Sequence, residues 1–158
     1  LGAGFEDTTD AIWERTFAVN VTSILRLSRA ALELLKKSSS ASIINLGSIM
    51  SDMAGPGLCA YGSSKHAVVA LTETINIEEC VNGIRACALC PAEVATPILD
   101  RRPVPPSPEE RARMLQADDL GKTILWIAEQ PPHVCINEIT ISPTWNRMFA
   151  GDAEHKPQ

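Results

Sequence analysis

Apolar residues recur at three- and four-residue steps over the first part of the chain. This periodicity predicts one buried face of a long helix. The helix is expected to begin after the cap-type residues Thr8, Thr9 and Asp10. It is expected to end near Lys36 and Lys37, whose charges suit a helix C-terminus. The apolar positions are Ile12, Trp13, Phe17, Val21, Ile24, Leu27, Ala31, Leu34 and Leu35.

Short apolar runs alternate with a second helical pattern. Residues 42–46 and 84–90 read as buried strands, the second closed by Pro91, and residues 135–141 read as a last strand. A helix is predicted from Tyr61 to about residue 79. Its apolar stripe contains Val68, Leu71 and Ile75, which are expected to lie in the core.

The C-terminal third contains a proline-rich loop over residues 100–108. Ser107 is expected to cap a new helix, with Glu110 completing a capping box. A further helix is predicted over residues 118–129. Alternating helices and strands predict βαβ units, hence a Rossmann-like α/β fold with a parallel sheet. We expect one α/β domain over residues 1–149, with a flexible tail at 150–158.

Composition narrows the class of protein. The chain has 158 residues, 45% of them hydrophobic and 21% charged, which is typical of a globular domain. A formal net charge of −5 argues against nucleic-acid binding. No apolar run approaches the length of a membrane span, so no membrane partner is expected. Five cysteines favour free thiols in a reducing compartment, and we predict a cytoplasmic protein.

The most informative chemistry is a tyrosine and a lysine four residues apart. This spacing places Tyr61 and Lys65 on one face of the predicted helix. A nearby ammonium group favours the phenolate, so the pair predicts a phenol that acts as a general acid or base. Ser48 ends one predicted strand, and Thr96 follows the end of the next. Ligands of open parallel sheets bind at such strand ends, where the Ser48 hydroxyl is expected to meet a substrate oxygen.

Other candidate sites are weaker. Cys87 and Cys90 form a Cys-x-x-Cys, but residues three apart on a strand point to opposite faces, so we interpret them as buried thiols. Neither the cysteines nor His66, His133 and His155 have the spacing of metal ligands, so no metal is expected. A serine hydrolase is disfavoured because the chain has no Gly-x-Ser-x-Gly elbow.

Several motifs accompany this pair in order along the chain. They are Asn20 within residues 17–21, Ser48 thirteen residues before Tyr61, the helix start at 61–68, the segment 91–97 and the closing strand near 137–144. Together these segments resemble those of the short-chain dehydrogenase/reductase family over nearly the whole chain. The resemblance implies hydride transfer between NAD or NADP and a small-molecule alcohol or carbonyl compound.

The resemblance also implies a role for each matching residue. Tyr61 would be the acid/base, and Lys65 would stabilise its phenolate and hold the nicotinamide ribose. Ser48 would position and polarise the substrate oxygen, and Asn20 would hold a water in a proton relay with Lys65. The residues implied to flank the nicotinamide are Pro91, Ala92, Val94 and Thr96. The loop 98–116 would cover the substrate, and the two long helices would pair with their copies in a homo-dimer or homo-tetramer.

The chain departs from the family in two places. Ala92 stands where the family usually has glycine. The family's first strands and its glycine-rich, pyrophosphate-binding turn have no counterpart, since Gly2-Ala3-Gly4 lacks a preceding strand and a third glycine. The choice between NAD and NADP therefore stays open. Because the chain starts at Leu1, we expect it to be processed or part of a longer protein. Because the first strands and the glycine-rich turn are missing from it, we expect this chain to be inactive alone.

A rival hypothesis is a truncated, non-catalytic protein of this family that acts through oligomerisation. The intact Asn20, Ser48, Tyr61 and Lys65 favour the enzyme, while the missing phosphate-binding turn favours the rival. The reading frame upstream of Leu1 distinguishes the two hypotheses, because an enzyme requires a glycine-rich βα unit there.

Overall fold

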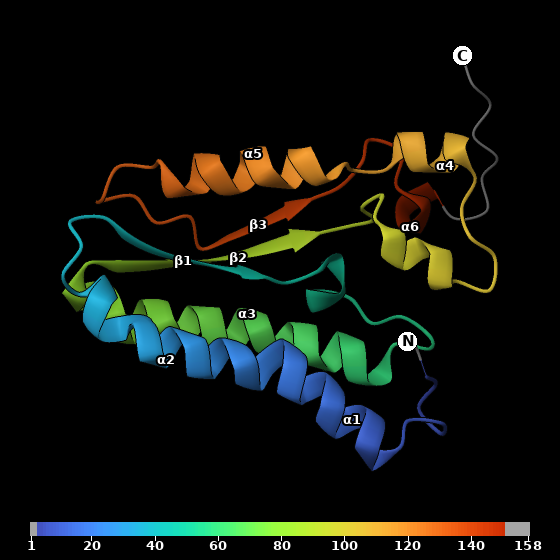
Figure 1. The fold of residues 1–158 in the computed structure, drawn as a ribbon, viewed down its shortest axis with the longest axis horizontal. Coiled ribbons are helices and arrows are strands. Elements are labelled where there is room, and N and C mark those ends of the chain that lie inside the picture. The colour runs from blue at the N-terminus through green and yellow to red at the C-terminus, as the bar shows by residue number, and fades with distance from the viewer. Residues whose placement is uncertain (1–2, 151–158) are drawn as a thin grey trace.

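The computed structural model describes residues 3–150 and arranges them in three layers (Figure 1). A parallel three-stranded sheet lies between α5 (Ala117–Ala128) on one face and α2 (Ser23–Leu35) with α3 (Cys59–Glu79) on the other. The strands are β1 (Ala41–Leu46), β2 (Ile84–Pro91) and β3 (Glu138–Ile141), in the order β1-β2-β3. The predicted α/β fold with a parallel sheet is confirmed.

The first predicted helix is continuous in space but not uniform. α1 (Asp10–Phe17) is capped by Thr9, whose Oγ1 accepts a hydrogen bond from the Ile12 N–H. A π-helical turn, η1 (Ala18–Thr22), then joins α1 to α2. Such turns are rare and occur often at functional sites, and this one carries Asn20.

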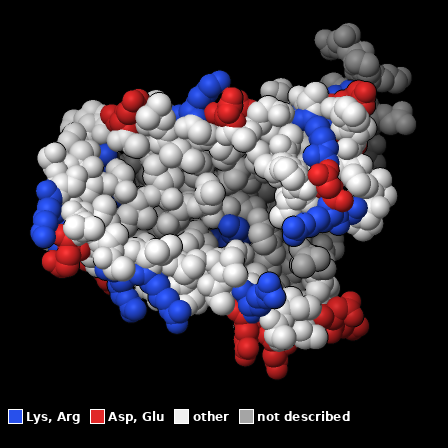
Figure 2. All heavy atoms as spheres, viewed as in Figure 1, with Lys and Arg blue, Asp and Glu red and all other residues white. Residues whose placement is uncertain are grey.

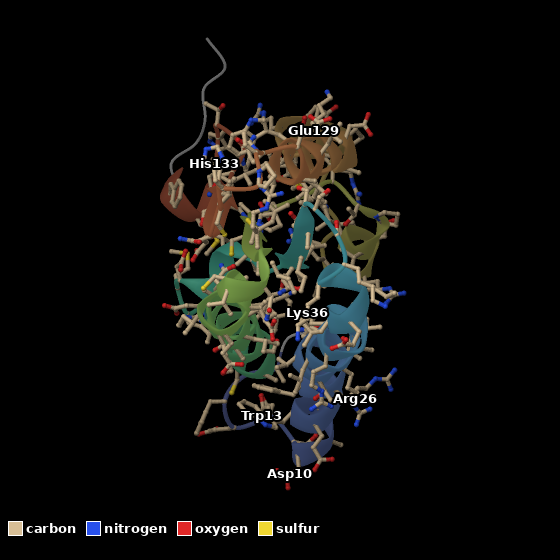
Figure 3. All side chains as sticks on the ribbon, turned by 90° about the vertical axis from the view of Figure 1, so that its left-hand side faces the viewer. Asp10, Trp13, Arg26, Lys36, Glu129 and His133 are labelled. Atoms are coloured by element: carbon tan, nitrogen blue, oxygen red, sulfur yellow. The ribbon has the colours of Figure 1, made fainter. Side chains whose placement is uncertain are left out.

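The burial of this helix is less than predicted: half-buried are Phe17, Val21, Ile24, Ala31 and Leu35, and exposed are Ile12, Trp13, Leu27 and Leu34. None of the described residues of α1, η1 and α2 is fully buried, and the Trp13 side chain, stacked on Phe17, is 39% exposed. The reason is that the segment packs against α3 and β1 on one side only. Figure 3 shows the layers edge-on, with Asp10, Trp13 and Arg26 at the end opposite Glu129 of the α5 layer.

The long helix α3 carries the predicted core stripe. Val68 is fully buried and Ile75 nearly so, while Leu71 is half-buried. After α3 and a short 3-10 turn, η3 (Cys80–Asn82), the chain reverses at Gly83, whose φ of 72° is the left-handed conformation that glycine adopts without strain. Within the described part of the chain, no helix is both long and apolar enough to cross a membrane.

The central strand β2 is the core of the fold. All of its residues from Ile84 to Cys90 are buried, because β1 and β3 cover its edges and helices cover both faces. Cys87 and Cys90 lie among them as free thiols, as expected for buried strand residues.

The buried guanidinium of Arg85 fastens α5 to the sheet. Its Nη1 donates to the carbonyl oxygens of Gln130, Pro131 and Val134 at 2.7–2.9 Å. Its Nη2 donates to the Ser42 hydroxyl at 2.8 Å. These carbonyls follow the C-terminus of α5, where the helix dipole is negative, so they balance a buried cation that has no carboxylate partner among the described residues.

The C-terminal third agrees with the prediction in outline. Ser107 caps α4 (Pro108–Arg113), and the capping box with Glu110 is present. The last strand, β3, is shorter than predicted. Of the predicted strand residues 135–137, only Asn137 takes part in the ladder, where its carbonyl accepts a hydrogen bond from the Ala88 N–H. A last helix, α6 (Arg147–Ala150), follows, and the rest of the predicted tail, 151–158, lies outside the described residues.

We predict that Gly47→Ala destabilises the fold by about 1–3 kcal/mol through overpacking. Gly47 follows β1, and a Cβ there would lie 2.5 Å from the Cys90 Sγ. Urea unfolding measures the loss. The loss should be smaller when the same change is made in a Cys90→Ala background. Gly121→Ala, where a Cβ meets nothing within 4 Å, is the control and should cost nothing. Equal costs at Gly47 and Gly121 would contradict the prediction.

We also predict that the free energy of unfolding falls between about pH 9 and pH 11. Burial raises the pKa of Cys87 from 9.0 to about 11, with smaller contributions from Cys135, Cys90 and Glu138. In this window the folded state holds a proton that the unfolded state has released, so stability is lost as pH rises, by at most about 3 kcal/mol. Unfolding at several pH values should show a shallower fall for Cys87→Ala. An equal fall of the free energy of unfolding with pH in the wild type and in Cys87→Ala would refute the assignment to Cys87.

Candidate active site

The tyrosine–lysine pair lies at the start of α3. Tyr61 is in the first turn of the helix and Lys65 is one turn further on. The Lys65 Nζ lies 5.7 Å from the centre of the Tyr61 ring. The two side chains therefore share one helix face, as their spacing predicts.

The ammonium group of Lys65 also contacts the sheet. Its Nζ donates a hydrogen bond of 2.8 Å to the carbonyl oxygen of Leu46, the last residue of β1. Burial lowers the pKa of Lys65, and the nearby Cys90 acts in the opposite direction. The contact places the positive charge at the carboxyl end of the sheet, where parallel α/β folds bind ligands.

Ser48 lies two residues beyond β1, at the start of the 3-10 turn η2 (Ile49–Ser51). Its side chain is nearly buried, and its Oγ accepts a hydrogen bond of 3.1 Å from the Met50 N–H. Within residues 3–150 its own O–H hydrogen meets no acceptor. The hydroxyl can therefore donate to the oxygen of a bound molecule.

Asn20 is joined to the same helix start through another serine. The Asn20 Nδ2 donates to the Ser64 Oγ at 2.9 Å, and this hydroxyl donates to the Tyr61 carbonyl oxygen at 2.7 Å. The π-helical turn η1 thus packs on the first turns of α3. Asn20 is thus linked through Ser64 to the backbone carbonyl of Tyr61, and its Nδ2 contact is to Ser64 rather than to Lys65.

Two residues of this arrangement are absent from the predicted set, Ser51 and Ser64. The Ser51 Oγ accepts from the Ser48 N–H at 3.2 Å and donates to the Lys65 carbonyl oxygen at 3.0 Å. A sequence signal exists for Ser51, because Ser48-x-x-Ser51 has the spacing of a capping box. Ser64 gives no such signal, because its partner Asn20 lies 44 residues away.

The segment expected to flank the nicotinamide follows β2. Pro91 ends the strand, and Ala92, Val94 and Thr96 come after it, all four half-buried. The Ala92 N–H donates to the Ile141 carbonyl at 2.8 Å, which ties the segment to β3. These residues leave the same end of the sheet as Ser48, and Figure 2 shows a hollow between the helical layers with a basic side chain inside it.

The loop expected to cover the substrate is folded rather than extended. It contains η4 (Pro97–Arg101) and α4, and pairing between Val94 and Leu115 closes its base. Glu93 accepts from Arg102 at 2.9 Å and from Arg147 at 2.5 Å, and Arg111 pairs with Asp100. These ion pairs attach the loop to the end of β2 and to α6.

Residues 3–150 contain no cluster of three or more histidine, cysteine or acidic side chains that could hold a metal ion. Cys87 and Cys90 remain unpaired thiols in the core, so the Cys-x-x-Cys does not form a disulfide.

Proteins with related sequences cover most of this chain. Dehydrogenase/reductase SDR family member 6 of Xenopus laevis is 31% identical over 153 residues, and the match covers 89% of this chain and 62% of the relative. Cyclopentanol dehydrogenase of Comamonas testosteroni is 33% identical over 129 residues, and the match covers 82% of this chain and 49% of the relative. The chain thus spans about half to three fifths of the length of these relatives.

Solved structures share the fold. The alcohol dehydrogenase of the archaeon Thermococcus sibiricus, complexed with 5-hydroxy-NADP, superposes with a TM-score of 0.78 at 23% identity, covering 93% of this chain and 61% of that one. A 4-hydroxyisoleucine dehydrogenase complexed with NADH superposes with a TM-score of 0.73 at 20% identity, and the match covers 92% of this chain and 64% of that one.

The model of one protein family matches residues 2–104, which include η1, the Ser48 turn, the start of α3 and the segment after β2. That family is described as short chain dehydrogenase. The match spans more than half of the chain and agrees with the related sequences and the shared fold. The chain therefore belongs to the short-chain dehydrogenase/reductase family.

Proposed function

We propose that the protein is an NAD(P)-dependent oxidoreductase that interconverts an alcohol and a carbonyl group on a small molecule. The proposal is supported by three groups near the carboxyl end of β1, to whose last carbonyl Lys65 is bonded and after which Ser48 follows. They are the Tyr61 phenol, the Lys65 ammonium group 5.7 Å from its ring, and the Ser48 hydroxyl with a free hydrogen. The names of two similar proteins, cyclopentanol dehydrogenase and alcohol dehydrogenase, agree with this substrate class.

The residues present fit the nicotinamide end of such a cofactor. The half-buried Pro91, Ala92, Val94 and Thr96 leave the sheet beside the strand whose last carbonyl binds Lys65. When bound, NAD or NADP would supply or accept the hydride. Among residues 3–150 no glycine-rich turn of the pyrophosphate-binding kind occurs, so we assign neither the adenosine half nor the choice of cofactor to these residues.

In the direction of reduction, the Ser48 O–H donates a hydrogen bond to the substrate carbonyl oxygen and polarises the C=O bond. The carbonyl carbon gains the hydride, and its oxygen takes the proton of the Tyr61 phenol to become a hydroxyl group. Oxidation runs the same steps backwards, with the phenolate accepting the alcohol proton. Tyr61 is thus the general acid in one direction and the general base in the other.

Lys65 and Asn20 act on Tyr61 rather than on the substrate oxygen. The ammonium group of Lys65 stabilises the phenolate and can bind the ribose hydroxyls. The Nδ2 of Asn20 is engaged by Ser64, which leaves its side-chain oxygen as the acceptor for a water. We assign this water to the relay that returns a proton through Lys65.

We also propose a homo-oligomer, a dimer or a tetramer, in the cytoplasm. Support for assembly is the apolar stripe that α1, η1 and α2 leave exposed, which includes Val19 at 63%, Leu27 at 71% and Leu34 at 72% exposure. Large apolar side chains left exposed along one segment are typical of protein interfaces. The free cysteines suit a reducing compartment.

We predict that Tyr61→Phe lowers kcat for carbonyl reduction at least 100-fold, because the variant keeps the ring and loses the proton. Lys65→Met should lower kcat and move the acid limb of the pH–rate profile for alcohol oxidation to higher pH. The measurement is a carbonyl screen with NADH and NADPH, using the protein expressed from its complete reading frame. Lys122→Met, on α5, is the matched control and should keep full turnover.

Full turnover by Tyr61→Phe would refute the acid/base assignment. An assembled protein with no turnover for any carbonyl or alcohol would instead favour the non-catalytic, oligomerising alternative.

We further predict that Leu27→Glu dissociates the oligomer, because it places a charge on the exposed stripe. Sedimentation velocity should show a shift to the monomer. Phe5→Glu changes a side chain that is 86% exposed and lies outside the stripe, and it should leave the assembly intact. A wild-type protein that sediments as a monomer would rule out this part of the proposal.

A further inference from the structure

The Ser51 hydroxyl makes two bonds to residues of the candidate site. It accepts from the Ser48 N–H at 3.2 Å and donates to the Lys65 carbonyl oxygen at 3.0 Å. Ser51 is only 4% exposed, so water does not compete strongly for either bond. One side chain therefore joins the turn that carries Ser48 to the helix that carries Tyr61 and Lys65.

Ser51 closes a ring of contacts around Lys65. The Nζ of this lysine is bonded to the Leu46 carbonyl before the turn, and its backbone carbonyl is bonded to Ser51 at the end of the turn. A carbonyl oxygen has two lone pairs, so the Ser51 bond adds to the helical bond of α3 rather than replacing it. Lys65 is thus held at both ends by the chain from Leu46 to Ser51.

The same turn sets the direction of the Ser48 hydroxyl. Ser48 and Ser51 form a reciprocal capping box, in which the Ser48 Oγ accepts from the turn while the Ser51 Oγ accepts from the Ser48 N–H. The Ser51 Oγ also lies close to the Gly47 backbone, where an added Cβ would stand 3.1 Å from it. One lone pair of the Ser48 Oγ is therefore engaged within the turn, and its hydrogen is left for another acceptor.

We propose that Ser51 is a positioning residue for the proposed reaction. It fixes the position of the Ser48 hydroxyl relative to Tyr61 and Lys65. This inference rests on the proposed function. Ser51 itself touches no reacting atom and acts through the Ser48 backbone and the Lys65 carbonyl. Misplacement of a reacting group by about 1 Å can cost roughly 100-fold in rate, so loss of this link should act on kcat.

The test compares Ser51→Ala with Thr72→Val in the protein expressed from its complete reading frame. Thr72 is a matched control, because it is a buried hydroxyl that also links β1 to α3. It accepts from the Asn45 Nδ2 at 2.9 Å and donates to the Val68 carbonyl at 2.7 Å, two helical turns beyond Lys65. Both substitutions remove the hydroxyl that accepts from one buried donor, although the Ser48 N–H keeps a weaker contact with the Cys90 thiol.

Three measurements are made on each variant: amide hydrogen exchange at Ser48, kcat with both KM values, and the pH–rate profile of alcohol oxidation. Ser51→Ala should reduce the protection of the Ser48 amide, whose remaining contact is the weaker one with the Cys90 thiol, and should lose at least 10-fold in kcat, with KM values within about threefold of wild type. The acid limb of its pH–rate profile should move to higher pH, because Lys65 is then held less firmly beside the Tyr61 phenol and stabilises the phenolate less. Thr72→Val should keep the Ser48 protection, kcat and pH profile.

A Ser51→Ala protein with the kcat and pH profile of Thr72→Val would overturn the positioning role. If Ser51→Ala does not fold, Ser51→Cys provides the second test, since a thiol keeps the volume but makes weaker, longer bonds. Loss of Ser48 amide protection in Ser51→Cys with unchanged kcat would also overturn it. A wild-type protein inactive with every alcohol and carbonyl would overturn the proposed function, whereas an active wild type with an unaffected Ser51→Ala would overturn only this inference.

Discussion

The bond from the Lys65 ammonium group to the Leu46 carbonyl is the contact on which the arrangement of the site depends. It joins the first turns of α3 to the last residue of β1, and so relates a helix face to a strand end. The cation is partly removed from water, which lowers the pKa of Lys65, and a carbonyl dipole partly replaces the lost hydration. The charge then stands beside the Tyr61 ring at the open end of the sheet.

Buried serine hydroxyls complete this arrangement. Ser64 links Asn20 to Tyr61, and Ser51 links Ser48 to Lys65. A hydroxyl both donates and accepts, so a single small side chain can satisfy a donor on one element and an acceptor on another. The four residues proposed for catalysis are therefore connected through groups that take no part in proton transfer.

The core of the fold explains why this end of the sheet is well placed for chemistry. β2 is buried along its length, and the close approach of Gly47 to Cys90 packs the chain after β1 directly on it. Arg85 secures the opposite end by binding the carbonyls that follow α5. Arg85 thus stabilises the end of the sheet at which β2 begins. The carboxyl ends of β1 and β2 lie at the other end, where the chain leaves the sheet at Ser48 and Pro91.

Sequence alone determined the features that depend on near neighbours along the chain. The helices and strands follow from local periodicity, the cap of α4 from the spacing of Ser107 and Glu110, and the shared face of Tyr61 and Lys65 from one helical turn. The tertiary structure alone decided the exposure of apolar side chains on α1, η1 and α2, the Lys65–Leu46 bond and the Asn20–Ser64 bond. A helical period shows that one face of a helix is apolar, but not which part of the protein covers that face. The partners of the two hydrogen bonds are separated by 19 and by 44 positions in the sequence, so these bonds depend on how the layers pack.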